Sequence, residues 1–122
     1  MANASVVACN SVATEIGSNN LVLYGVFDQM QAPVFPTRVT FFGVAKVWGA
    51  TANQSIVLKL VEAATNEVVS QAAEHKSTGE THTAISVFQG VTVPKSGSYE
   101  VRAYIGDQVL GAYPISVGSA KA

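Results

Sequence analysis

The sequence has few charged residues. They make up 12% of its 122 positions, about half the share found in an ordinary soluble domain. The net charge is −1 and the charges form no basic or acidic block, which argues against nucleic acid and membrane surfaces as partners. A domain of this size has a large surface. Such a low charge therefore predicts that copies of the chain or another protein cover part of that surface.

Cysteine is nearly absent as well. Cys9 is the single cysteine, so no intrachain disulfide can form, and we expect a buried, reduced thiol rather than a nucleophile. Residues 1–8 lack the positive and apolar regions of a signal peptide, and the apolar runs are too short to cross a membrane. We therefore expect a cytoplasmic protein, or one that belongs to a virion-type particle assembled in the cytoplasm.

Signatures of catalysis and cofactor binding are also missing. The sequence contains no G-x-S-x-G elbow and no glycine-rich phosphate loop. His75 and His82 are the only histidines, and two imidazoles without a cysteine or carboxylate cluster at ligand spacing make a poor metal site. We expect no catalytic residue, cofactor, metal or small-molecule ligand, while an enzyme whose site is assembled in space stays open as a weaker alternative.

What the sequence does contain is apolar residues that recur with a period of two. The segments 56–61 and 98–105 show it, and it is typical of half-buried strands. Turn residues, such as GSNN at 17–20 and PKSG at 94–97, separate these segments at short intervals. The pattern predicts strands at 5–14, 21–29, 38–48, 54–62, 67–75, 82–88, 98–105 and 108–117. A helix competes only at 61–76, where Ala, Glu and Gln are frequent but Thr65-Asn66 interrupts them.

Regularly spaced short strands favour a sandwich or a barrel. At 122 residues the chain is long enough to bury one core without disulfides or metals. We therefore expect one β domain over residues 1–122, with an ordered core at about 5–117 and a short tail at 118–122.

Two stretches of the sequence are similar to a known family. ACNSVATEIGSNNLVLYGVFDQMQAPVFP at 8–36 has Gly-Val-Phe-Asp at 25–28 and Phe-Pro at 35–36. It resembles a widespread bacterial family of small proteins known only as a domain of unknown function. VTVPKSGSYEVRAYIGDQVLGAYPISV at 91–117 resembles the closing hairpin of that family and of many bacterial immunoglobulin-like domains. The resemblance implies an all-β fold, a single immunoglobulin-like antiparallel β-sandwich of about seven to eight strands, and it implies no activity.

The motif residues have structural roles in our interpretation. Tyr99 follows the glycine turn at Gly97 and opens a strand, so it can bury its ring and return its hydroxyl to a main-chain group. Gly25, inside an apolar run, indicates a bulge or a close packing contact. Asp28 is expected to close the following turn by accepting main-chain hydrogen bonds.

The connection at 32–36 is the last of these motif segments. Proline on both sides of Val34 and Phe35 predicts an extended, stiff segment that ends at Pro36. We expect Phe35 to point into the core.

The segment TFFGVAKVW at 40–48 is too apolar for a strand with one wet face. If its odd-numbered residues face the core, the opposite face carries Phe42, Val44 and Trp48. One interpretation is that the connection at 32–36 or a terminal segment covers this second face. The other is a protein–protein contact, in which aromatic residues usually dominate the binding energy. Val57 and Val61, on the outer face of the next strand, would then extend the same patch.

Two functions follow from these observations. The first is a non-enzymatic structural subunit that self-associates or decorates a larger protein assembly, such as a virion or a sheath, and it is favoured by the low charge. The alternative is a cytoplasmic immunoglobulin-like module that binds a peptide or a partner protein, for example at a sheet edge. In both cases the expected partners are proteins.

Overall fold

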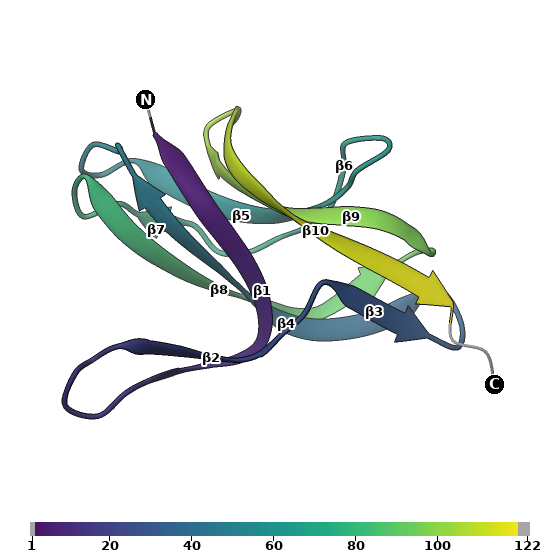
Figure 1. Cartoon of the computed structure of the whole chain (residues 1–122). Helices are drawn as coiled ribbons and strands as arrows, with labels where there is room; N and C mark the ends of the chain where they lie inside the picture. The colour runs from purple at the N-terminus through teal and green to yellow at the C-terminus, as the bar shows by residue number, and fades with distance from the viewer. Residues whose placement is uncertain (1, 120–122) are drawn as a thin grey trace.

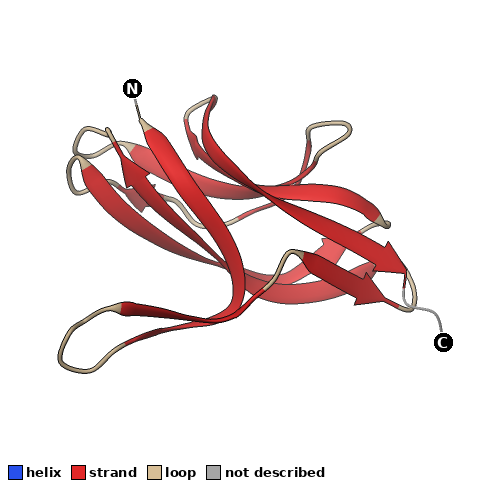
Figure 2. Ribbon diagram, viewed as in Figure 1, coloured by secondary structure: helices blue, strands red, loops and turns tan. Residues whose placement is uncertain are grey.

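The computed structural model describes residues 2–119 and shows ten β-strands and no helix in that range (Figure 2). The described residues therefore contain no helix that could span a membrane. The strands are β1 (Asn3–Thr14), β2 (Leu21–Val26), β3 (Gln29–Ala32), β4 (Thr37–Trp48), β5 (Ser55–Glu62), β6 (Glu67–Gln71), β7 (His75–Lys76), β8 (Thr81–Val93), β9 (Gly97–Ile105) and β10 (Gln108–Ser119).

The strands form two sheets that pack face to face (Figure 1). The four-stranded sheet has the order β2-β1-β4-β8. The six-stranded sheet has the order β3-β10-β9-β5-β6, and β7 also pairs with β5. Neighbouring strands are antiparallel except β3 and β10, which run parallel. The chain changes sheet between β2 and β3, so β2 lies at the edge of one sheet while β3 lies at the edge of the other.

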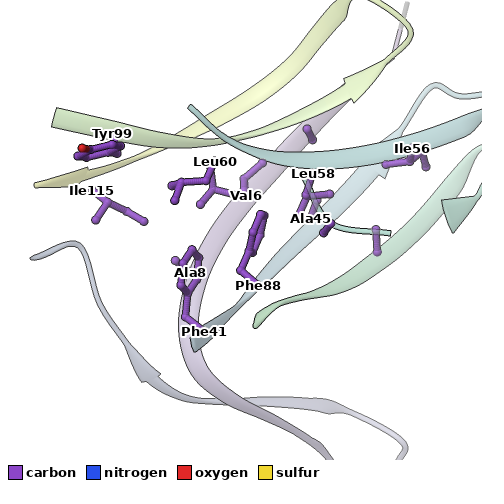
Figure 3. Close-up of a cluster of buried hydrophobic side chains, with 14 of the residues drawn as sticks. Val6, Ala8, Phe41, Ala45, Ile56, Leu58, Leu60, Phe88, Tyr99 and Ile115 are labelled. Atoms are coloured by element: carbon purple, nitrogen blue, oxygen red, sulfur yellow. The ribbon is translucent and has the colours of Figure 1, made fainter. Parts of the chain in front are cut away.

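The core lies between the two inner faces, where apolar residues of period two meet (Figure 3). Phe41 of β4 stacks on Phe88 of β8 with ring centroids 4.9 Å apart. Gly43 lies beside them, and a Cβ built there would come within 2.9 Å of the Leu58 side chain. A small residue is therefore required at this point of β4, because the opposite sheet fills the space.

Several predicted boundaries differ from the observed ones. The strand predicted at 21–29 is two strands, β2 and β3, in different sheets, and the strand predicted at 67–75 divides into β6 and β7. The strand predicted at 82–88 continues to Val93. Ten strands form where the resemblance implies about seven to eight. Of the predicted tail at 118–122, Gly118 and Ser119 belong to β10, and residues 120–122 lie outside the described residues.

The helix considered at 61–76 does not form. Its residues make the end of β5, a turn, and the strands β6 and β7. Asn66 adopts a φ of 60° in that turn, and its N–H donates to the Glu62 carbonyl at 2.8 Å. Asparagine tolerates this left-handed conformation, which ends one strand and starts the next.

Tyr99 holds the turn that opens β9. Its side chain is 1% exposed and its hydroxyl donates to the Lys95 carbonyl at 2.7 Å. Burial of the ring is the main cause that raises the pKa of the hydroxyl above its usual range. Gly97 lies between the two residues with a φ of 148°, a conformation in which glycine is favoured. The arrangement expected from the sequence is therefore present in the fold.

The other motif residues lie at the change of sheet. Gly25 has a φ of 65°, and a Cβ there would come within 2.5 Å of the Asn10 amide nitrogen, so a close approach requires glycine. Asp28 accepts a hydrogen bond from Ser116 N–H at 2.9 Å. The accepting atom is the main-chain carbonyl oxygen of Asp28. Phe35 is partly buried and packs against the core, and Pro36 is exposed.

Cys9 is a fully buried free thiol. It lies on β1 between Val26 of β2 and Phe42 of β4, its direct partners in the two ladders. Loss of hydration in this position is the main cause that raises the pKa of the thiol, against a smaller opposite effect of a backbone hydrogen bond at Ser11. A raised pKa leaves less thiolate at neutral pH, and thiolate is the reactive form.

Replacing Tyr99 by Phe removes the hydroxyl and keeps the ring. We expect the free energy of unfolding to fall by about 1 kcal/mol, because the Lys95 carbonyl loses its donor. Tyr24→Phe is the matched control, since Tyr24 is 54% exposed, and its effect should stay within about 0.5 kcal/mol. Equal effects of the two substitutions in urea unfolding would contradict this role for Tyr99.

Cys9 should react slowly with a thiol reagent in the folded protein and quickly in denaturant, because reaction requires both access and thiolate. Reaction rates with and without denaturant at one pH check this. A native rate close to the denatured rate would show an exposed or activated thiol.

Candidate protein-contact face

The outer face of the four-stranded sheet, which points away from the core, carries rows of apolar side chains. Direct pairing places Val7, Val44 and Ile85 side by side across β1, β4 and β8, and the next row joins Cys9, Phe42 and Val87. Side chains directly opposite one another across a ladder lie on the same face of a sheet. We call this surface the outer face; its large apolar members are Val7, Phe42, Val44, Trp48, Ile85 and Val87.

The outer face is partly open to solvent. Val87 is 46% exposed, Trp48 42% and Ile85 37%, whereas Val44, in the middle of its row, is 7% exposed. Trp48 is therefore not fully covered, contrary to the interpretation that another segment covers β4 on this side. Phe42, Val44 and Trp48 do share one face, as the alternation along the strand predicts.

Charge is scarce on the outer face. The rows that follow join Ser5, Lys46 and Thr83, and then Asn3, Trp48 and Thr81. Among the described residues in these four rows, Lys46 is the one charged side chain, and it is exposed. These rows border the apolar rows on one side, and on the other side the alternation along β4 places Arg38, which is exposed, on the same face.

Val57 and Val61 do not extend this surface, and the expectation that they would is wrong. Both lie on β5, which belongs to the six-stranded sheet and pairs with β9, β6 and β7. Val57 lies opposite Tyr104, and Val61 opposite Glu100. Val61 is fully buried although it lies outside the cluster that fills the core.

The six-stranded sheet covers its own outer face with charged side chains. Arg102 Nε donates to Glu100 Oε1 at 2.7 Å, and its Nη2 reaches across β5 to Asn66 Oδ1 at 2.9 Å. Hydrogen bonds to the side chains of Tyr104 and Glu100 raise the pKa of Arg102. Lys59 Nζ lies 4.5 Å from the centre of the Tyr104 ring. Long charged side chains can cover apolar surface with their stems while their heads stay hydrated, so this face needs no partner.

The sequence alone did not identify Val7, Ile85 and Val87 as members of the outer face. The residue types of β8 are misleading for the last two, because the small residues Ala84 and Ser86 are buried while the larger apolar residues Ile85 and Val87 are exposed. Their place beside Phe42 and Val44 depends on the pairing of β8 with β4, which the sequence does not state.

The histidine pair is the strongest chemical cluster elsewhere in the chain. The rings of His75 and His82 have centroids 6.3 Å apart. His75 Nε2 lies 3.2 Å from Ser86 Oγ, and His82 Nδ1 lies 3.4 Å from Thr78 Oγ1. Within residues 2–119 no group of three or more His, Cys, Asp or Glu side chains could hold a metal ion.

Two hollows indent the surface elsewhere. One, of about 270 Å³, lies beside Tyr99 and is bordered by Asp28 and Glu100. The other, of about 370 Å³, lies beside Phe27 and Met30. Neither lining, among the described residues, places a histidine, cysteine or lysine next to a hydroxyl. The outer face is thus the feature that most needs a functional explanation.

Some solved structures are similar to this chain. The chain is similar to an immunoglobulin-like protein from Pseudomonas aeruginosa, with 12% identity, 96% of both chains covered and a TM-score of 0.46. It is also similar to part of a β-glucosidase from Listeria innocua that was solved with isofagomine. That match has 10% identity and a TM-score of 0.44, and it covers 96% of this chain and 16% of the glucosidase. No curated protein matches the chain.

The family comparison covers nearly the whole chain. A sequence model of a family of unknown function, DUF6941, matches residues 4–118. The protein is all-β, with two packed sheets and an immunoglobulin-like neighbour among solved structures. The chain therefore belongs to the DUF6941 family, and its fold is a sandwich of two β-sheets.

Proposed function

We propose that this protein is a non-enzymatic structural subunit that contacts protein through the outer face of its four-stranded sheet. The observation that carries the proposal is the difference between the outer sides of the two sheets. One is covered by an Arg102 network, and the other exposes Val87, Trp48 and Ile85 with two charged residues, Lys46 and Arg38, that form no such network among the described residues. Contiguous exposed apolar surface of this kind marks interaction sites.

The size of the outer face is sufficient for a specific contact. Its rows cross three strands, β1, β4 and β8, which at about 4.8 Å each cover about 14 Å, and a strand of the length of β4 spans about 40 Å. The face thus offers about 550 Å², and two such faces would bury about 1,100 Å² in total, which reaches the size expected of a specific interface. Trp48 and Phe42 supply the aromatic side chains that are enriched in such interfaces.

Self-association is the first form of this proposal, and decoration of a larger assembly, virion-like or sheath-like, is an extension of it. The working location is the cytoplasm, where the thiol of Cys9 stays reduced. The second candidate is a module that binds a peptide or another protein. The edge strand β8 favours it, because that strand is the last of the four-stranded sheet next to Val87 and Ile85, and an extended peptide can add to such an edge.

Val87→Asp tests the outer face directly. A carboxylate there would have to be desolvated in the contact, so we expect self-association to weaken at least about tenfold in sedimentation experiments. Val109→Asp is the matched control. Val109 is the same residue type with the same 46% exposure, but it lies on β10 of the other sheet. Equal effects of the two substitutions, or a wild-type chain that is monomeric at high concentration, would reject self-association through this face.

Trp48→Ser separates a contact residue from a core residue. A contact residue should lose about 2 kcal/mol of association, or about 30-fold in the dissociation constant. The fold should lose clearly less than the ~3–5 kcal/mol that truncation of a core aromatic costs, because Trp48 is 42% exposed. Thermal unfolding and particle mass measured on the same variant distinguish the two. Early melting with unchanged association would place Trp48 in the core.

A further inference from the structure

The β1–β2 hairpin leaves the body of the sandwich. Pairing of β1 with β4 ends at Cys9, and from there to Thr14 the ladder of β1 joins it to β2 alone. Figure 1 shows this hairpin projecting away from both sheets. We call residues 10–26 the arm. A two-stranded hairpin by itself is marginally stable at best in water, so the arm lacks the support that the other strands have.

The arm is apolar as well as isolated. Its sequence NSVATEIGSNNLVLYGV contains one charged residue, Glu15. Ile16 at the tip is 101% exposed, Val26 55% and Leu21 38%. Exposed apolar side chains gathered on a projecting hairpin are typical of an interaction surface.

One side of the arm carries mainly apolar side chains. Val12 lies directly opposite Leu23, and Thr14 directly opposite Leu21, so these side chains share a side. By the alternation along β1, Val12 points to the same side as the core residues Val6 and Ala8. The arm therefore carries a core-like side beyond the point where the sandwich covers it.

We propose that the arm of one chain packs on the outer face of a second copy of this chain, and that the second arm does the same in return. This inference rests on the proposed function and names the partner of the outer face. The apolar side of the arm, with Val12, Leu21 and Leu23, meets Phe42, Ile85 and Val87 of the other copy. The arm supplies one acid, Glu15, and the outer face supplies two bases, Lys46 and Arg38.

The area of the contact favours a reciprocal pair, in which each of two chains packs its arm on the outer face of the other. The arm is about 10 Å wide and about 25 Å long, and so offers about 250 Å². One arm on one foreign surface would bury about 500 Å² in total, which is below a stable interface. Two arms on two faces bury on the order of 1,000 Å², which reaches the size expected of a specific contact. A two-fold pair gives this doubling without any further surface.

Charge reversal tests the pairing of Glu15 with Lys46. In the wild-type pair each arm places an acid near a base. Glu15→Lys or Lys46→Glu creates like charges at both contacts of the pair, so we expect each variant alone to weaken self-association about tenfold at low salt. Glu67→Lys is the control, because it changes the net charge by the same amount as Glu15→Lys at an exposed position on β6 of the other sheet.

Mixing the two variants is the decisive part of the experiment. In a mixed pair, the base introduced by Glu15→Lys on one chain meets the acid introduced by Lys46→Glu on the other. At the second contact the original Glu15 meets the original Lys46. Both contacts are then attractive, so an equimolar mixture should return to within about threefold of the wild-type affinity in sedimentation equilibrium. A chain with both substitutions should associate equally well.

Other results overturn the inference. A mixture that associates no better than the two separate variants, or a Glu67→Lys effect as large as that of Glu15→Lys, removes the arm as the partner of the outer face. If Val87→Asp still dissociates the wild-type assembly in that case, the outer face remains the contact and only the arm is wrong. If the wild-type chain is monomeric at high concentration, the second copy is rejected along with self-association.

Discussion

The sandwich covers one face of each sheet, and everything else in this structure depends on how the two remaining faces meet water. The six-stranded sheet hydrates its face with Arg102, Glu100 and Lys59, whose long side chains also shield the apolar surface of β5. The four-stranded sheet carries Lys46 and Arg38 on its outer face but no comparable network among the described residues, and it exposes Val87 and Trp48. The shortage of charge is therefore concentrated on one side. A uniform shortage would lower solubility without marking a site, whereas a local shortage marks one surface for contact.

The alternation of the sequence was sufficient to predict which residues of β4 face the core. Phe41 and Val47 point inward and Trp48 points outward, because side chains on a strand alternate with a period of two whatever the strand pairs with. The same reasoning failed for Val57 and Val61. A period of two indicates on which side of a strand each residue lies, but it does not indicate to which sheet the strand belongs. The turn after β4 carries the chain into the other sheet, so β4 and β5 do not share an outer face.

The features that the sequence did not predict all depend on pairing between distant segments. Ile85 and Val87 join the outer face only because β8 pairs with β4 in the observed register. The arm arises because β1 loses β4 as a neighbour after Cys9, and no local pattern shows the end of a ladder between distant strands. The change of sheet after β2 was hidden for a similar reason. Gly25 indicated an irregularity, but a bulge, a close contact and a change of sheet all use glycine in the same way.

The edge strands of the four-stranded sheet raise the same question as its outer face, namely how unwanted contacts with other chains are prevented. Exposed edge strands usually carry charge, proline or a bulge that prevents pairing with other chains. Neither β2, with the sequence LVLYGV, nor β8, with THTAISVFQGVTV, contains a Lys, Arg, Asp, Glu or Pro residue. The edge strand β8 does contain a bulge, opposite Val39 and Phe41 of β4. Along the rest of β8, and at β2, protection against unwanted pairing must come from another segment that covers the edge or from the direction in which the strand points. The arm provides geometry at the β2 edge, since it turns that strand away from the body. An arm that packs on a second copy would cover the β8 edge, because it would place apolar surface over β8 where Ile85 and Val87 are exposed. One contact would thereby shield both the face and its adjoining edge, and the sheet could then do without the charged residues that other β-proteins place there.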